Sequence, residues 1–74
     1  MINDDFLKLL ISKDVYSDLA VSMTISAFED LCKIDIADND THWICLFRDC
    51  KLDFYLTIKE FENYLIGMSR QNDF

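Results

Sequence analysis

The chain contains no proline and a single glycine, Gly67. Its turns must therefore use other residues, and Asp38-Asn39-Asp40 is the most favourable candidate because Asp and Asn side chains bond to nearby backbone groups. With 51% hydrophobic residues, the composition is not that of a disordered chain. Seventy-four residues are enough for one small domain, and we expect a single domain over residues 1–74.

Long apolar runs and paired cysteines are also missing. No run approaches the ~20 residues that a membrane-spanning helix needs, so we expect a soluble protein with no membrane partner. The three cysteines are odd in number, and the polar start Asn3-Asp4-Asp5 is unlike a secretion signal. We therefore predict reduced thiols and a cytoplasmic location. Cys32 and Cys45 fall at expected core positions, and Cys50, in a predicted loop, is the one candidate for a reactive thiol, although an unreactive thiol is the simpler interpretation.

Basic residues are scarce. Seven Lys and Arg against fourteen Asp and Glu give a net charge of −7. This balance opposes binding to nucleic-acid phosphates, which favour clustered Lys and Arg. Acidity most simply keeps a small protein in solution. The alternatives are a basic partner or mimicry of nucleic acid.

No catalytic or metal-binding pattern is present. Cys45 and Cys50 do not have the close spacing of zinc ligands. Asp38, Asp40 and His42 resemble the start of a calcium loop, but the glycine and the glutamate that complete such a loop are missing. A carboxylate pair for acid–base work needs burial, whereas Glu29, Asp30, Asp35, Glu60 and Glu62 all fall on predicted solvent faces. We predict a protein that is not an enzyme, with no cofactor and no metal.

The first half of the chain predicts a strand and then a helix. Phe6 to Ser12 alternates in hydrophobicity, as strands do. Ser17 is a good N-cap, and the apolar spacing from Asp18 to about Cys32 is helical, interrupted only by Thr24. The apolar residues cover more of the helix circumference than contact with one sheet requires. We therefore expect this helix to contact both a sheet and a second helix.

The second half predicts a hairpin and a final helix. Lys33–Ala37 and His42–Arg48 read as strands joined by a turn at residues 38–41. A loop at residues 49–53 follows, and an extended segment at residues 52–56 stays open as an alternative. Thr57 and Glu60 have capping-box spacing and predict the start of a helix that ends at Gly67 or within residues 69–72.

The order β-α-β-β-α predicts an α+β domain. We expect two helices on one face of a three-stranded sheet, or of a four-stranded sheet if residues 52–56 are extended. If the first two strands are parallel, their connection should be right-handed.

The strand His42–Arg48 is apolar on both faces. Ile44 and Leu46 fall on one face, with Trp43, Cys45 and Phe47 on the other. Only one face can meet the helices, and the other is either covered by residues 52–56 or left for a partner, because exposed apolar patches usually mark contact sites. Our candidate partner- or peptide-binding residues are Trp43, Cys45, Phe47, Phe6 and Leu10.

Three segments carry a resemblance to a known family. They are Tyr16-Ser17 at a helix start, the segment from Phe28 to Ile36, and the block from Thr57 to Ile66, with its Phe61-x-Asn63-x-Leu65 pattern followed by Arg70. With these, residues 12–70 resemble the HxsD-like family, small accessory proteins of the His-Xaa-Ser peptide-modification system.

The resemblance implies a non-catalytic helper in the maturation of ribosomally made peptides. Its partners would be the precursor peptide, its radical-SAM maturase, or both. Because the chain has no cysteine motif for an iron–sulfur cluster, the radical chemistry would belong to the maturase.

Two other hypotheses stay open. One is a small acidic inhibitor from a phage or mobile element that blocks a basic nucleic-acid-binding site. The other is a homodimer joined through the open sheet face.

Overall fold

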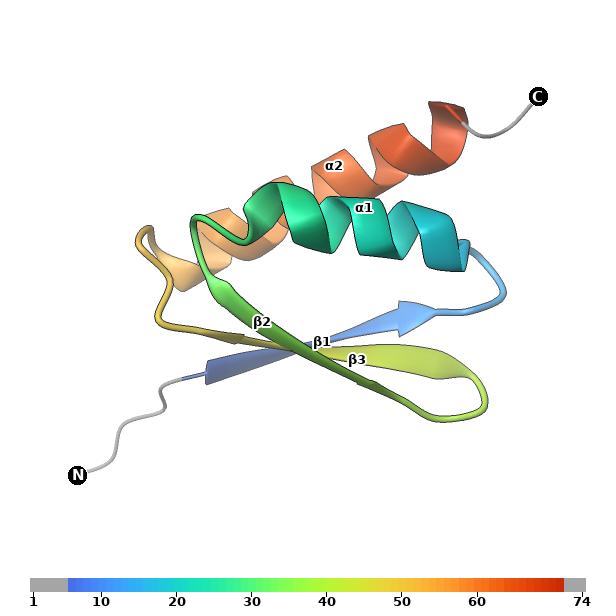
Figure 1. Cartoon of the computed structure of the whole chain (residues 1–74), viewed down its shortest axis with the longest axis horizontal. Coiled ribbons are helices and arrows are strands. Elements are labelled where there is room, and N and C mark those ends of the chain that lie inside the picture. The colour runs from blue at the N-terminus through green and yellow to red at the C-terminus, as the bar shows by residue number, and fades with distance from the viewer. Residues whose placement is uncertain (1–5, 72–74) are drawn as a thin grey trace.

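The computed structural model describes residues 6–71, which form three strands and two helices (Figure 1). The elements are β1 (Phe6–Ser12), α1 (Asp18–Phe28), β2 (Lys33–Asp38), β3 (His42–Arg48) and α2 (Phe54–Gln71). This order confirms the predicted α+β class, with both helices on one side of the sheet (Figure 1). Residues 54–56 are helical, so the alternative of a fourth strand at residues 52–56 is wrong.

The sheet has the order β1-β3-β2, and both outer strands are antiparallel to β3. Leu9 and Ile36 lie on either side of Cys45 in this register. β1 and β2 therefore run in the same direction but are separated by the inserted β3. The central strand is apolar on both faces, and β1 and β2 are the two edges.

The β2–β3 turn uses Asn39, as its sequence predicts. The Asn39 side-chain oxygen accepts hydrogen bonds from the backbone N–H groups of Thr41 (2.9 Å) and His42 (2.8 Å). Lys13, which follows β1, donates to the Asp38 carboxylate at 2.6 Å and to the Asn39 carbonyl at 2.6 Å. The turn is thus closed by an amide side chain in place of glycine.

Helix α1 begins as predicted and ends early. The Ser17 hydroxyl oxygen accepts a hydrogen bond from the Ala20 N–H at 3.1 Å, which confirms the N-cap. The helix ends at Phe28, where the hydrogen bonds change to an i→i−3 spacing: the Glu29 N–H donates to the Ser26 carbonyl (3.4 Å) and the Leu31 N–H to the Phe28 carbonyl (2.9 Å). The prediction of a helix to Cys32 is therefore wrong by one turn.

Helix α2 begins at Phe54, before the predicted start at Thr57. The Asp53 carboxylate accepts a hydrogen bond from the Leu56 N–H at 3.1 Å and caps the helix. Thr57 lies inside the first turn, where its hydroxyl donates to the Asp53 carbonyl at 2.9 Å. The predicted capping box of Thr57 and Glu60 is wrong, because the Thr57 side chain is buried and bonds backwards along the helix.

The core lies between the helices and the sheet. Phe61 of α2 packs edge-to-face against Phe28 of α1 (5.4 Å between ring centroids) and Phe47 of β3 (5.0 Å). Thr24, which interrupts the apolar pattern of α1, is fully buried, and its hydroxyl donates to the Ala20 carbonyl at 2.7 Å. The buried apolar residues are Ile11, Ala20, Val21, Phe28, Cys32, Cys45, Phe47, Phe61 and Leu65.

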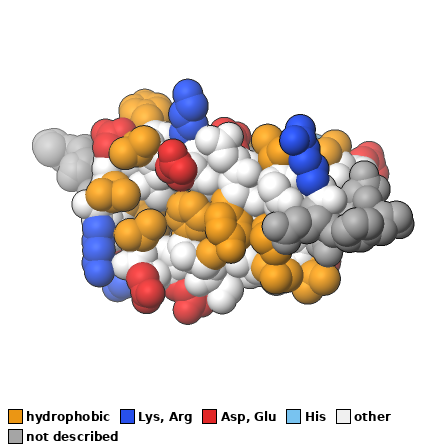
Figure 2. All heavy atoms as spheres, turned by 90° about the horizontal axis from the view of Figure 1, so that it is seen from above, with side chains coloured by type: hydrophobic (Ala, Val, Ile, Leu, Met, Phe, Trp, Pro, Cys, Tyr) orange, Lys and Arg blue, Asp and Glu red, His pale blue; other side chains and the backbone are white. Residues whose placement is uncertain are grey.

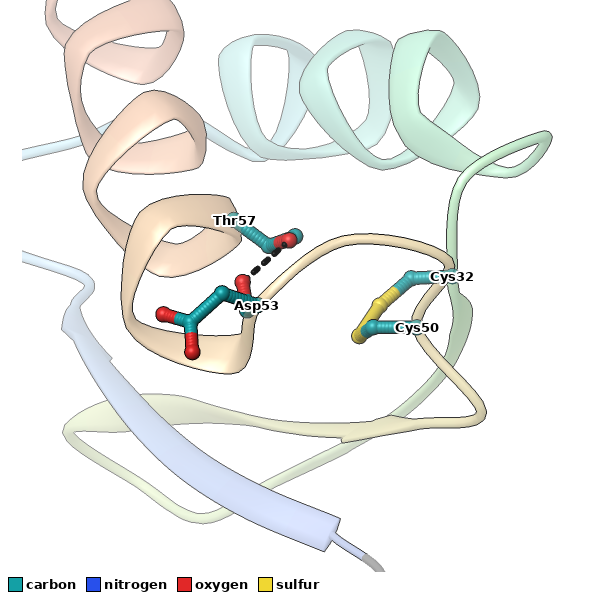
Figure 3. The surroundings of a disulfide bond; sticks show 4 residues. All are labelled: Cys32, Cys50, Asp53 and Thr57. Carbon is teal, nitrogen blue, oxygen red and sulfur yellow. Dashed lines mark hydrogen bonds between the residues drawn. A yellow bond between two sulfur atoms is a disulfide. The ribbon is translucent and has the colours of Figure 1, made fainter.

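A disulfide joins Cys32 and Cys50 (Figure 3). It connects the segment after α1 to the loop after β3, and a backbone bond from the Lys51 N–H to the Leu31 carbonyl (2.8 Å) ties the same two segments. The prediction of three reduced thiols is therefore wrong: the fold brings two cysteines together, and an odd count does not exclude one pair. Cys45 is the free cysteine and is buried.

Candidate functional site

The two faces of β3 have opposite environments. Cys45 and Phe47 are 0% exposed beneath the helices, and Trp43 packs on the same core. The choice of Cys45 and Phe47 for partner contact is therefore wrong, because the helices already cover them, whereas Trp43 is half-buried and lines a groove beside β2. Ile44 and Leu46 alternate with these residues and lie on the opposite face of the sheet.

The face opposite the helices is open across the described residues. Figure 1 shows both helices on the other side of the sheet. Leu10 of β1 is paired with Ile44 in the register and is 56% exposed. Phe6, the remaining candidate, is paired with Arg48, and its side chain lies outside the described part of the structure. Of the sequence candidates, Leu10 is the one that the described side chains place on the open face.

The helix side also carries apolar surface. Figure 2 shows it with apolar side chains spread among acidic and basic ones. The exposed large apolar residues on the two helices are Leu19, Met23, Tyr55, Leu56, Tyr64 and Ile66. Because polar side chains and backbone atoms lie between the apolar groups in Figure 2, the helix side does not offer one continuous docking surface.

The outer edge of β1 presents free backbone groups. A bond from the Lys13 N–H to the Thr41 carbonyl (2.9 Å) continues the β1–β3 ladder. In an antiparallel pair every second residue directs both backbone groups at its partner strand. This alternation turns the N–H and C=O of Lys8 and Leu10 away from β3, toward the edge that no described strand occupies.

A groove of about 530 Å³ runs between this edge and α2. Leu9 and Ile11 contribute from β1, and Leu65 and Ile66 from α2. Polar α2 side chains also line it, among them Lys59. An open strand edge next to an apolar groove is the geometry in which an extended peptide can both pair with a strand and bury side chains.

The β2 edge is less suited to strand pairing. A bond from the Asn39 N–H to the His42 carbonyl (3.0 Å) continues the β2–β3 ladder, so the backbone groups of Ile36 point outward. Three of the six β2 residues are charged, and charged edge residues discourage pairing. The groove beside β2, of about 400 Å³, includes the carboxylates of Asp18 and Asp38.

Titratable and metal-binding chemistry is sparse in the described part of the chain. Burial raises the pKa of the Cys45 thiol from 9.0 to about 11, so this thiol stays protonated and unreactive near neutral pH. Residues 6–71 contain no group of three or more His, Cys, Asp or Glu side chains placed to hold a metal ion. Cys50, the predicted candidate for a reactive thiol, is in the disulfide.

The groove beside β1 was not predicted from the sequence. Its only local signal is the sequence of β1, in which Lys8 is the single charged residue and both faces are apolar. The contribution of Leu65 and Ile66 depends on how α2 crosses the sheet, which their spacing does not specify.

Comparisons with family models, curated proteins and solved structures find no match to this chain. Within residues 6–71, neither helix combines the length and the hydropathy required to cross a bilayer.

Proposed function

We propose that this protein is a non-catalytic accessory protein that binds an extended peptide segment by adding it to the edge of β1. The observation that carries the proposal is the free β1 edge beside the groove lined by Leu9, Ile11 and Leu65. The resemblance to the HxsD-like family supplies the partner: a precursor peptide of a ribosomal-peptide modification system, its radical-SAM maturase, or both.

Strand addition uses both features of the edge. The backbone groups of Lys8 and Leu10 would bond to the peptide and give affinity that does not depend on its sequence. Alternate side chains of the added strand would then enter the groove beside Leu9 and Ile11, where apolar residues are favoured. The protein would thus select extended segments with an apolar residue at every second position.

The edge can be tested with Leu10→Pro. The Leu10 N–H points away from β3, so proline removes a donor from the free edge without removing a bond of the β1–β3 ladder. Peptides are first selected from a displayed random library against the wild-type protein. We expect alternating apolar peptides, and we expect Leu10→Pro to weaken their binding at least tenfold in fluorescence anisotropy.

Two controls separate the edge from other surfaces. Ile36→Pro makes the same backbone change on the β2 edge and should leave binding unchanged. Leu10→Ala removes the side chain but keeps the N–H, so binding should largely persist. Far-UV circular dichroism checks that each variant folds. If Ile36→Pro weakens binding as much as Leu10→Pro, or the library yields no peptide, strand addition at β1 is wrong.

A second copy of the chain is the competing occupant of the β1 edge. Sedimentation velocity over a range of concentrations distinguishes the two. A stable dimer that Leu10→Pro converts to monomer would assign the edge to self-association and not to a peptide.

We also propose a cytoplasmic location. The Cys32–Cys50 disulfide counts against this location, because thiols are kept reduced in the cytoplasm and disulfides are rare there. Alkylation of the protein in intact cells, followed by a count of labelled cysteines, tests the location together with the redox state. Protection of Cys32 and Cys50 from the reagent would argue for an oxidising compartment.

A further inference from the structure

We infer that the open sheet face is a second interaction surface, distinct from the β1 edge, and that it docks one acidic amphipathic helix of a partner protein. The centre of this face is apolar and is formed by neighbouring residues of three strands. Ile44 of β3 lies between Leu10 of β1 and Ala37 of β2, and Leu46, two residues further along β3 on the same face, extends the patch. We call these four residues the open-face patch.

The dimensions of the face match a single helix. Three strands about 4.8 Å apart span roughly 10 Å, which is about the diameter of an α-helix with its side chains. Strands of seven residues are about 23 Å long, the length of roughly 15 helical residues. A helix on this face would complete a three-layer arrangement with the sheet in the middle.

The charge of the face selects the partner. Lys8, Lys33 and Arg48 flank the patch near one end of the sheet, and Asp35 is the one carboxylate on the three strands that shares their face. Asp49, from the loop after β3, approaches Lys33 at 3.7 Å and offsets part of this charge. The face stays net positive in a chain whose net charge is −7. A positive surface on an acidic protein is complementary to an acidic partner.

The same charge argues against a second copy as the occupant. Stacking two open faces would bring two net-positive surfaces together, and such like-charge contacts disfavour association. Lys8 makes no ion pair within residues 6–71, so an acidic partner would supply its counter-ion. The homodimer through the open face is thus the less favourable of the two arrangements.

Two synthetic helical peptides test the inference. Both have the same leucine stripe, which is flanked by glutamates in one and by lysines in the other. The protein is labelled with ¹³C in the methyl groups of Ile, Leu and Val. We expect the glutamate peptide to shift the methyl signals of Leu10, Ile44 and Leu46, while those of Ile11 and Leu65 in the core move little. The glutamate peptide should bind at least tenfold more tightly than the lysine peptide.

A matched pair of variants isolates the charge of the face. Lys8→Glu reverses a charge beside the patch, and Arg70→Glu makes the same charge reversal on α2, on the other side of the sheet and outside the lining of the β1–α2 groove. We expect Lys8→Glu to weaken binding of the glutamate peptide about fivefold or more and Arg70→Glu to have little effect. Both side chains are exposed, so neither variant should disturb folding.

Three results would overturn the inference. Equal binding of the two peptides would show that the charge of the open face does not select its partner. Equal weakening by Lys8→Glu and Arg70→Glu would mean that only the net charge of the protein matters. Shifts confined to residues beside the β1–α2 groove, with the methyl signals of Ile44 and Leu46 unchanged, would place the helix elsewhere.

Discussion

Neighbouring residues of β3 belong to two different surfaces. Cys45 and Phe47 are fully buried under the helices, whereas Ile44 and Leu46 lie on the open side of the sheet. Both pairs are apolar, so hydrophobicity alone does not distinguish them. The difference comes from the position of the helices: the covered face holds the fold together, and the open face has apolar side chains to offer a partner.

The largest expected contrast is between Phe47→Ala and Leu46→Ala. Phe47 is in contact with Phe61 in the core, and its truncation leaves a cavity, so the free energy of unfolding should fall by about 3–5 kcal/mol. Leu46 faces the open side, so Leu46→Ala should lower the free energy of unfolding by only about 1 kcal/mol. Urea unfolding of both variants measures the two values. Similar losses would mean that the open face is covered in solution.

The disulfide belongs to the covered side, where it ties the end of α1 to the loop before α2. Cys50→Ala should lower the free energy of unfolding by about 3 kcal/mol, because the bond closes a loop with a sequence separation of 18 residues. Thermal unfolding with and without reductant measures the effect. The reductant should not change the Tm of Cys50→Ala, and an unchanged wild-type Tm would contradict the prediction.

Cys45, on the covered face, should make the stability of the folded protein depend on pH. Its pKa is raised by burial from 9.0 to about 11, so the folded protein holds this proton more tightly than the unfolded chain. The stabilisation that this proton provides is fully present below pH 9 and is lost as the pH rises through about 11. The total change is about 2–3 kcal/mol.

The matched variant for this effect is Cys45→Val, which keeps an apolar side chain of similar size but does not titrate. Urea unfolding from pH 8 to pH 11 should show the wild-type stability falling more steeply than that of the variant. Parallel pH profiles would show that the Cys45 thiol is accessible to solvent, contrary to its burial.

Local patterns predicted the strands and the first helix start well. β1 and β3 have the predicted bounds, and Ser17 caps α1 as expected, because alternation and N-cap chemistry are properties of short segments. The start of α2 was missed because Asp53 and Thr57 are both good N-caps, and burial of the Thr57 side chain decides between them.

The features that depend on long-range packing were not predictable. The covered face of β3 is set by which side α1 and α2 pack on, and the strand pattern is compatible with either side. The Cys32–Cys50 bond likewise requires the end of α1 and the end of β3 to meet, which no spacing in the sequence indicates. Of the candidate residues, Cys45 and Phe47 lie on the covered face and Leu10 on the open one, a difference that the alternation within the strands does not reveal.

The smallest expected effect on stability comes from an ion pair on the open face. Arg48 and Asp35 form an ion pair at 2.7 Å across β3 and β2, with side chains 46% and 59% exposed. An exposed pair of this kind contributes about 0.2–1 kcal/mol and is screened by salt. A double-mutant cycle with Arg48→Ala and Asp35→Ala, measured by urea unfolding at low and high salt, should give a coupling in that range that shrinks as salt rises. The double variant removes both charges and so corrects for the loss of each side chain alone. A larger, salt-insensitive coupling would show that this pair is desolvated in solution, so the open face would then be an occupied interface between copies of the chain.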